Sequence, residues 1–295
     1  VRRYTALHVG SNPTDATFYM TDYAAFIADH FEIVDKQGNL VPFVLWPHQQ
    51  AILDTMTNRT IVLKPRQIGS SAFNLAMFAT DFILEDNIRL VIIAHDQGTT
   101  TRLIDRAKHY LRTFEAKTGV TIPLKYNNRG EIIRSDNGNT LYIGTAGNRS
   151  FGVGDTIHKL LASEVSRYED AETVMTNVLQ AVPKDGWVMI ESTANGYGNW
   201  YQLQWSKAEL NESTFKPIFL SWRDVPEYQQ EGWEEQKRGE YVDERLFAQD
   251  FPETPEEAFL MSGNPFFDVE TVQAMLKSAP AVEQQGNLTM EGVWL

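Results

Sequence analysis

The sequence contains no cysteine and no long apolar run. Without cysteine, disulfide bonds and thiolate metal sites are excluded. The six histidines are scattered, with no pair at ligand spacing, which argues against a zinc site. No apolar run approaches the ~20 residues that a membrane-spanning helix needs, and the sequence shows no signal peptide. We therefore expect a soluble, intracellular protein without membrane contacts.

Basic residues are also scarce. Lysine and arginine number 26 against 39 aspartate and glutamate residues, so the formal net charge is −13. This charge argues against non-specific duplex binding by the whole surface, and any nucleic-acid contact has to be local. The 295 residues, 42% of them apolar, suffice for a full core and a small second unit. The first residue is Val1 rather than methionine, so we expect a trimmed or partial chain.

The stretch from Thr60 to Ser71, TIVLKPRQIGSS, carries the most informative local pattern. A β-branched apolar run typical of a buried strand is followed by a turn at Gly69, and Ser70 and Ser71 stand where a helix N-cap belongs. Apolar residues then recur at helical spacing as far as Leu84. Such a strand, turn and helix start can cradle a phosphate, because free N–H groups and the helix dipole attract the anion. The pattern also suits a strand and a capped helix that bind no ligand.

The loop departs from the regular phosphate-binding pattern G-x-x-x-x-G-K-[ST]. That pattern would place glycine at the position of Lys64 and lysine at the position of Ser70. Lysine stands instead at the start of the loop, and Arg66 follows it closely. The sequence leaves open which of these two cations replaces the usual loop lysine.

The rest of the chain alternates between strand-like and helix-like segments. Strand-like runs follow the loop at Arg89–His95, Thr140–Gly144, Ile157–Ala162 and Trp187–Ile190. Apolar residues at helical spacing predict helices at about Thr100–Thr118 and Ala171–Gln180. This alternation predicts an α/β fold, a mostly parallel sheet flanked by helices on both faces. Ligands bind such sheets at the carboxyl ends of the strands, so functional residues should follow the ends of these runs.

Polar side chains stand after two of the predicted strands. Glu164 can take a proton from a water that attacks a γ-phosphorus. Ser163, before it, occupies a position where an aspartate usually orders a magnesium shell, a task its hydroxyl can perform only weakly. Thr193 and Asn195 suit a polar sensor near phosphate oxygens. An ordinary strand-terminal glutamate and a plain Asx turn are the alternative interpretations.

A further polar residue precedes the loop. Gln49 lies in a helix expected to begin near Pro47, after a hairpin predicted over residues 31–43. A glutamine amide near a nucleotide can both donate to and accept from an adenine edge. A surface side chain is the alternative.

Together these segments resemble the ATPase domain of tailed-phage large terminases, the DNA-packaging motors. The resemblance covers roughly Phe26 to Phe267 and rests on Trp46–Gln49, Lys64–Ser71, Leu160–Glu164, Ser192–Gly196, Phe219–Trp222 and Phe251–Phe259. It implies a P-loop NTPase fold of the type with an additional strand and a catalytic glutamate. It also implies ATP and Mg²⁺ as cofactors.

The resemblance implies a role for each motif. Residues 192–196 would relay hydrolysis to movement, and Gln49 would read the adenine. Such motors often place a trans-acting arginine at the position of Val153, and Arg149 is the nearest candidate. The implied catalytic residues are Glu164, Lys64, Arg66 and Arg149, and the implied metal site consists of Ser71, Ser163 and Glu164. The implied nucleotide-binding residues are Gln49, Lys64, Pro65, Arg66, Gln67, Ile68, Gly69, Ser70, Ser71, Thr193 and Asn195.

The resemblance also implies an organisation and a set of partners. Residues 1–214 would form the ATPase core with an N-terminal extension, and residues 215–295 a small aromatic-rich lid or linker subdomain. The C-terminal nuclease domain of terminases would begin about where this chain ends, so no nuclease activity is expected. The motor would couple hydrolysis of Mg-ATP to translocation of double-stranded DNA into a prohead.

The implied location is the host cell cytoplasm, with transient docking on the prohead and no place in the mature virion. The implied partners are the portal protein, the small terminase subunit and further copies in a homo-oligomeric ring, although the isolated chain is expected to be a monomer. Two other functions stay open. One is a different DNA-dependent ATPase, such as a helicase-like remodeler. The other is a catalytically degenerate nucleotide-binding adaptor.

Overall fold

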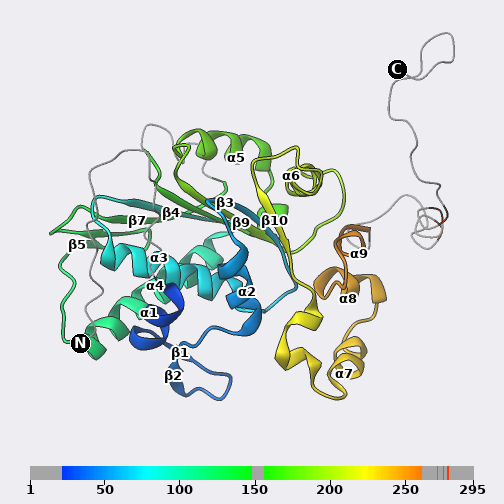
Figure 1. Ribbon diagram of the computed structural model, residues 1–295, viewed down its shortest axis with the longest axis horizontal. Coiled ribbons are helices and arrows are strands. Elements are labelled where there is room, and N and C mark those ends of the chain that lie inside the picture. Colours follow the sequence, from blue (N-terminus) through cyan, green and yellow to red (C-terminus); the bar gives the residue numbers. More distant parts are fainter. Residues whose placement is uncertain (1–21, 148–155, 261–270, 272–274, 276–277, 279–295) are drawn as a thin grey trace, which may run out of the picture.

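An eight-stranded sheet forms the centre of the molecule in a computed structural model, which describes residues 22–147 and 156–260 and the single positions 271, 275 and 278 (Figure 1). The strands are β3 (Arg59–Leu63), β4 (Arg89–Ala94), β5 (Leu124–Asn127), β6 (Glu131–Arg134), β7 (Thr140–Thr145), β8 (Lys159–Ser163), β9 (Trp187–Ser192) and β10 (Lys216–Phe219). Their spatial order is β10-β3-β9-β8-β4-β7-β6-β5. The strands from β10 to β7 are parallel, and β5 and β6 add an antiparallel hairpin at one edge. The predicted α/β fold with a mostly parallel sheet is confirmed.

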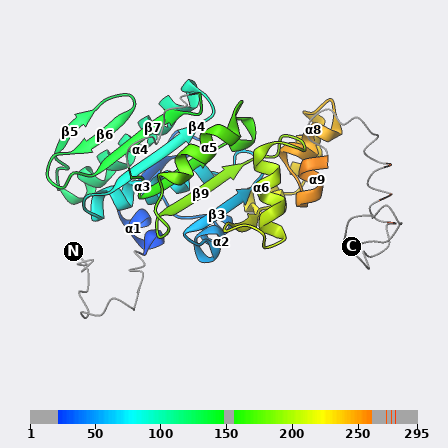
Figure 2. The same ribbon diagram turned by 90° about the horizontal axis from the view of Figure 1, so that it is seen from above.

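Helices cover both faces of this sheet (Figures 1 and 2). One face packs against α1 (Tyr23–His30), α3 (Ser70–Leu84) and α4 (Gln97–Thr118), and the other against α5 (Ala171–Gln180) and α6 (Trp200–Glu209). Side chains alternate along each strand, so Val62 enters the first core while Ile61 and Leu63 enter the second. Because both faces are covered, the central strands are apolar almost throughout, as the sequence indicated.

Strand β9 lies between β3 and β8. In this register Leu63 of β3 is opposite Ser192, and Ser163 of β8 is opposite Glu191. Since the three strands run parallel, their carboxyl ends meet at one edge of the sheet. The additional strand implied by the resemblance is therefore β9, and it separates the loop strand from the strand that carries Glu164.

The segment before the sheet follows the sequence pattern closely. Strands β1 (Glu32–Val34) and β2 (Leu40–Pro42) pair as an antiparallel hairpin. Helix α2 (Pro47–Thr55) follows, with Trp46 as its N-cap residue and Pro47 in its first turn. The hairpin and the helix start were both predicted correctly. Among the described residues, no helix is long and apolar enough to cross a membrane.

Within the described residues, one short element follows β8 and five follow β10. They are η1 (Val165–Arg167), η2 (Trp222–Asp224), η3 (Pro226–Gln229), α7 (Trp233–Gly239), α8 (Glu244–Asp250) and α9 (Pro255–Leu260). Helices α7, α8 and α9 gather on one side of the sheet, beyond β10 (Figure 1). Aromatic stacking holds this part together: the ring centroids of Tyr228 and Trp233 lie 4.4 Å apart. These helices fall within the segment expected to form a lid.

Strand β10 was not predicted. It lies beyond residue 214, where we placed the end of the ATPase core, and it nevertheless pairs with β3 at the edge of the main sheet. The main sheet therefore extends as far as Phe219. The edge hairpin β5–β6 was also missed, because its strands are short and largely polar.

Candidate functional site

The loop between β3 and α3 turns through two residues in the left-handed conformation. Gln67 has φ 58° and Gly69 has φ 72°. A Cβ atom at position 69 would also lie 2.8 Å from Gln49 Nε2, so the Gln49 amide would have to shift. Within the described residues, the backbone N–H groups of Gln67, Ile68 and Gly69 have no hydrogen-bond acceptor. Together with the open first turn of α3, they provide the donors that an anion requires.

The prediction that Ser70 or Ser71 caps α3 is wrong. Gly69 is the N-cap residue, and the two serines are the first residues of the helix. Their hydroxyl groups donate to Glu191. Of the other loop residues, Pro65 and Ile68 are buried, whereas Gln67 and Gly69 are exposed.

Two side chains of α2 contact backbone carbonyl oxygens of the loop. Gln49 Nε2 donates to the Gly69 carbonyl oxygen across 3.1 Å, and Gln49 Oε1 accepts from the Trp46 N–H across 3.0 Å. His48 Nε2 lies 2.7 Å from the Ile68 carbonyl oxygen. Gln49 is buried and supports the turn around Gly69. Its contact with an adenine stays a prediction.

Lys64 forms a buried ion pair with Glu164. Its Nζ donates to Glu164 Oε1 across 2.9 Å, and its side chain is only 6% exposed. Burial works against the ammonium charge, but the carboxylates of Glu164 and Glu191 outweigh it and raise the pKa of Lys64. Burial also works against the charge of Glu164, yet Lys64 and Arg167 hold its pKa below the ordinary value. Both partners are therefore charged at neutral pH and neutralise each other.

Two more residues approach the second oxygen of this carboxylate. Thr193 Oγ1 lies 3.4 Å from Glu164 Oε2, so the segment after β9 contacts the predicted catalytic residue directly. Arg167 Nε lies 3.8 Å from the same oxygen. We did not single out Arg167 from the sequence, and its position three residues after Glu164 is the only local signal. Glu164 itself has φ 59°, a strained conformation that non-glycine residues adopt mainly at special sites.

Glu191 is the second carboxylate of the site and was also missed. It is completely buried at the end of β9. Its Oε1 accepts from Ser71 Oγ at 2.7 Å and from Ser163 Oγ at 3.0 Å. Its Oε2 accepts from Ser70 Oγ and, at 3.0 Å, from Asn74 Nδ2. A signal was present in the sequence, since Glu191 is a lone charge directly after an apolar strand.

The three residues predicted to hold a metal do not all converge. Ser71 and Ser163 meet at Glu191, whereas Glu164 faces Lys64. Among the described residues, no group of three or more His, Cys, Asp or Glu side chains could hold a metal ion. Magnesium in nucleotide sites takes most of its ligands from phosphates and water and needs only one or two protein carboxylates. The donors present here fit that kind of site and no all-protein metal cage.

Arg66 belongs to a different contact. Its Nη1 lies 3.0 Å from Asp250 Oδ2, and its backbone N–H donates to the Asp250 carbonyl oxygen. Tyr241 donates to the same carboxylate across 2.9 Å, and Tyr228 donates to the Arg66 carbonyl oxygen. Of the two cations in the loop, Lys64 thus lies inside the site and Arg66 ties the loop to α8.

Hydrogen bonds connect the segments at the ends of β8 and β9. Ser192 Oγ donates to Ser166 Oγ across 2.7 Å, and Asn195 Nδ2 donates to the Ser166 carbonyl oxygen across 3.1 Å. The sensor role predicted for Asn195 is untested. Arg149, predicted to act on a neighbouring subunit, lies outside the described residues.

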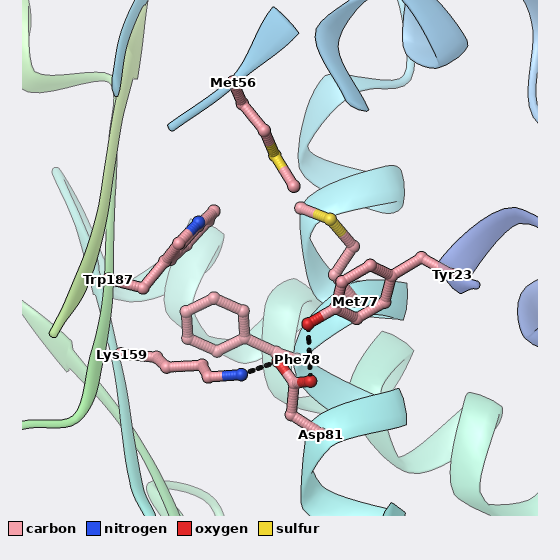
Figure 3. Close-up of a pocket in the computed structure, with 7 residues that line it drawn as sticks. All are labelled: Tyr23, Met56, Met77, Phe78, Asp81, Lys159 and Trp187. Carbon is pink, nitrogen blue, oxygen red and sulfur yellow. Dashed lines mark hydrogen bonds and ion pairs between the residues drawn. The ribbon is translucent and has the colours of Figure 1, made fainter. Parts of the chain in front are cut away.

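A small pocket lies at the opposite end of the sheet, where β8 and β9 begin (Figure 3). Its lining consists of Tyr23, Met56, Met77, Phe78, Asp81, Lys159 and Trp187. Asp81 accepts from the Tyr23 hydroxyl across 2.7 Å and lies 2.8 Å from Lys159 Nζ. The pocket lies where the parallel strands begin, whereas the loop after β3 lies where they end. The two are therefore at opposite edges of the sheet.

No protein-family model and no curated protein matches the sequence. Solved structures do resemble the fold. The large terminase ATPase domain of Thermus phage P74-26 has a TM-score of 0.53 and 17% identity, over 69% of this chain and 90% of that one. The HK97 bacteriophage large terminase has a TM-score of 0.63 and 11% identity, over 92% of this chain and 65% of that one. The large terminase of a thermophilic bacteriophage, in complex with ADP, has a TM-score of 0.54 and 12% identity, over 68% of this chain and 51% of that one. The chain therefore shares the fold of large terminase ATPase domains, with a P-loop NTPase-like sheet.

Proposed function

We propose that this chain is the ATPase of a viral DNA-packaging motor and that it hydrolyses Mg-ATP at the edge where β3, β9 and β8 end. The observation that carries this proposal is the Lys64–Glu164 pair beside a loop with free N–H groups. Phosphoryl transfer needs a cation, an anion cradle and a base. Here they are the buried Lys64, the loop N–H groups and the carboxylate of Glu164, which directly follows β8. Fold similarity to terminases, one of them in complex with ADP, supports the choice of nucleotide.

In this proposal the loop binds the phosphates. The N–H groups of Gln67 to Gly69 and the first turn of α3 face the β-phosphate, and Lys64 supplies the charge that the usual loop lysine would provide. A triphosphate competes with Glu164 for the Lys64 ammonium group, because it offers several anionic oxygens to a desolvated donor. Binding of ATP thus separates the ion pair and frees Glu164.

The freed carboxylate is the general base. Glu164 accepts a proton from a water molecule, whose oxygen attacks the γ-phosphorus as the bond to the β,γ-bridging oxygen breaks; the products are ADP and phosphate. Loss of the Lys64 contact raises the pKa of Glu164 towards the value at which it accepts a proton readily. A magnesium ion, when bound, would neutralise charge on the phosphate oxygens, and the proposed ligand from this chain is the hydroxyl of Ser71.

Movement would start at Thr193, which contacts Glu164. Its neighbour Ala194 accepts from Gln249 Nε2 across 3.2 Å, so a shift of this segment reaches α8. The chain of contacts leads from the catalytic carboxylate to the segment proposed as the lid. Double-stranded DNA, the portal protein, the small terminase subunit and a ring of copies are the proposed partners, with Arg149 acting on a neighbouring site.

The decisive experiment compares Glu164→Gln with Glu169→Gln. Glu169 is an exposed residue of the same segment and serves as the matched control. Glu164→Gln should bind a fluorescent ATP analogue nearly as well as the parent chain, while its turnover falls about 10²–10⁴-fold, because the amide keeps the shape and loses the base. Turnover within a few-fold of the parent would refute the catalytic role of Glu164. A parent chain that binds nucleotide without hydrolysing it would instead point to an adaptor.

A second measurement separates a packaging motor from a helicase-like remodeler. Full-length duplex DNA and empty proheads are mixed with the chain and ATP, and DNA protected from nuclease is quantified. A fluorophore–quencher duplex measures strand separation in parallel. Protection without strand separation is the result expected of a packaging motor, and strand separation without protection contradicts it.

A further inference from the structure

Glu191 is a fully buried carboxylate without a described ion-pair partner. Four donors hold it instead: the hydroxyls of Ser70, Ser71 and Ser163 and the amide of Asn74. A buried charge is costly unless hydrogen bonds satisfy it, and apolar side chains would fill the same space at lower cost. An acidic side chain held in this way by four donors points to a role beyond packing.

The strand register explains where this carboxylate lies. Ser163 of β8 is opposite Glu191 of β9, and their side chains meet at 3.0 Å. Ser163 ends β8, at the position where an aspartate was expected to order a magnesium shell. The serine there carries only a hydroxyl, and the longer side chain from the adjacent strand brings an acidic group beside it.

The same carboxylate also contacts the first turn of α3. Ser71 Oγ, the hydroxyl suited to a magnesium ion at a nucleotide site, donates to Glu191 Oε1 across 2.7 Å. Glu164, the other acidic group at this edge, is paired with Lys64. Glu191 is therefore the carboxylate directed at the Ser71 hydroxyl.

One unsatisfied acceptor lies next to this network. Asn74 Oδ1 is buried and has no hydrogen-bond donor among the described residues, although Asn74 Nδ2 donates to Glu191 Oε2 across 3.0 Å. Buried side-chain acceptors are nearly always paired. An additional donor, such as a water molecule of a metal shell, would satisfy it.

We propose that Glu191 orders the divalent cation of the nucleotide site, in place of an acidic residue at position 163. The inference rests on the proposed function in assuming that a nucleotide binds at this edge. It adds that the metal-ordering carboxylate comes from the additional strand. Glu191 acts by accepting a hydrogen bond from Ser71, which orients the hydroxyl oxygen for the metal, while Asn74 Oδ1 is the acceptor left for metal-bound water. Carboxylates outside the direct ligands tune metal sites in this way.

The test measures binding, with no hydrolysis involved. Calorimetry gives the affinity for ADP in magnesium and in EDTA, and the ratio of the two defines the magnesium enhancement. Manganese, titrated into the ADP complex and followed by electron paramagnetic resonance, gives the metal affinity directly. The variants are Glu191→Gln, Glu191→Asp, Ser163→Asp and the double change Glu191→Gln with Ser163→Asp. Glu209→Gln, on α6, is the control. Thermal unfolding verifies that each variant is folded.

Glu191→Gln should lower manganese affinity about 10- to 100-fold and remove most of the magnesium enhancement, while ADP affinity in EDTA stays within a few-fold of the parent. Glu191→Asp, which retracts the carboxylate by one methylene, should show a smaller loss in the same direction. The double variant should regain the enhancement, because it returns an acidic group to β8. This rescue separates a metal role from a merely structural one.

Three results would overturn the proposal. If Glu191→Gln keeps the full magnesium enhancement, Glu191 is structural while the proposed function stands. If Glu191→Gln does not fold, Glu191→Asp takes its place in the test. An unchanged magnesium enhancement in Glu191→Asp would likewise show that Glu191 is structural. If the parent chain binds no ADP with or without magnesium, the proposed function fails, and this inference fails with it.

Discussion

Lys64 Nζ and Glu164 Oε1 lie 2.9 Å apart although 100 positions of the sequence separate the two residues. Each is a group that the proposed reaction needs free: the ammonium for phosphate and the carboxylate for a proton. The two groups satisfy each other, which keeps two buried charges compensated. In the proposed reaction, this pairing would make Glu164 a poor base until a nucleotide takes the place of one partner.

The first prediction concerns the charge of the loop. Lys64→Ala should weaken ATP binding about 10- to 100-fold, since a charge-assisted hydrogen bond at a desolvated site contributes about 1.5–3 kcal/mol. Arg102→Ala, an exposed change on α4, serves as the control and should have no effect. Fluorescence anisotropy of a labelled ATP analogue measures both. A silent Lys64→Ala combined with a damaging Arg66→Ala would show that the loop's cation is misassigned.

The second prediction concerns Gly69. Gly69→Ala should destabilise the protein by about 1–2 kcal/mol through the left-handed conformation alone. It should also weaken nucleotide binding, because the new methyl group would press against Gln49. Adding Gln49→Ala should relieve the contact without removing the conformational cost. Urea unfolding of these variants and of Gly239→Ala, where the space is open and φ is ordinary, makes the comparison. Equal stability of Gly69→Ala and the parent chain would contradict the loop geometry.

The third prediction concerns the link between the loop and α8. Asp250→Asn should speed amide hydrogen exchange over residues 64–69, because the anchor of Arg66 is weakened. The Arg66 side chain is 53% exposed, so solvent screening limits the loss of overall stability to about 1 kcal/mol or less. Asp243→Asn, at the start of α8, is the matched control. Unchanged exchange in the loop would show that the ion pair does not restrain it.

The fourth prediction concerns Asp81 in the pocket of Figure 3. Burial raises the pKa of its carboxyl from the ordinary 3.8 to about 7, against the opposing charge of Lys159. The folded protein thus holds a proton that the unfolded chain releases above about pH 4. This contribution to stability is complete below pH 4 and is lost as the pH rises through 7, at up to about 1.4 kcal/mol per pH unit. Tyr23 and Glu85 also face this group: the charge of Glu85 opposes its ionisation, whereas the hydrogen bond from Tyr23 favours it.

Asp81→Asn removes this titration. The free energy of unfolding of the variant, measured relative to that of the parent chain, should therefore increase from about pH 5 to about pH 8. Asp54→Asn, an exposed change on α2, should show no such trend. If the free energy of unfolding of Asp81→Asn instead falls relative to the parent chain at the higher pH, the ion pair with Lys159 outweighs burial. The direction of the pKa shift assigned to Asp81 is then wrong.

Local pattern was sufficient for much of the fold. The predicted strand from Thr60 to Leu63, the helix at Ala171–Gln180 and the helix start at Pro47 all reappear in the structure, because each depends on periodicity or on a residue with restricted backbone angles. Strand alternation with helices was enough to place Glu164 and the loop at the same edge of a parallel sheet. The hairpin β5–β6 and strand β10 were missed because short polar strands carry almost no periodic signal.

The sequence by itself determined the α/β class, the glycine turn after β3 and the set of polar residues at the strand ends, since these follow from side-chain spacing along the chain. Only the tertiary structure decided how the charges are paired. Lys64 meets Glu164, Arg66 meets Asp250, and Ser71 meets Glu191 across 120 positions of sequence. Such pairs depend on strand order and register, and the insertion of β9 between β3 and β8 is what brings a third carboxyl end, with its own buried glutamate, against the loop.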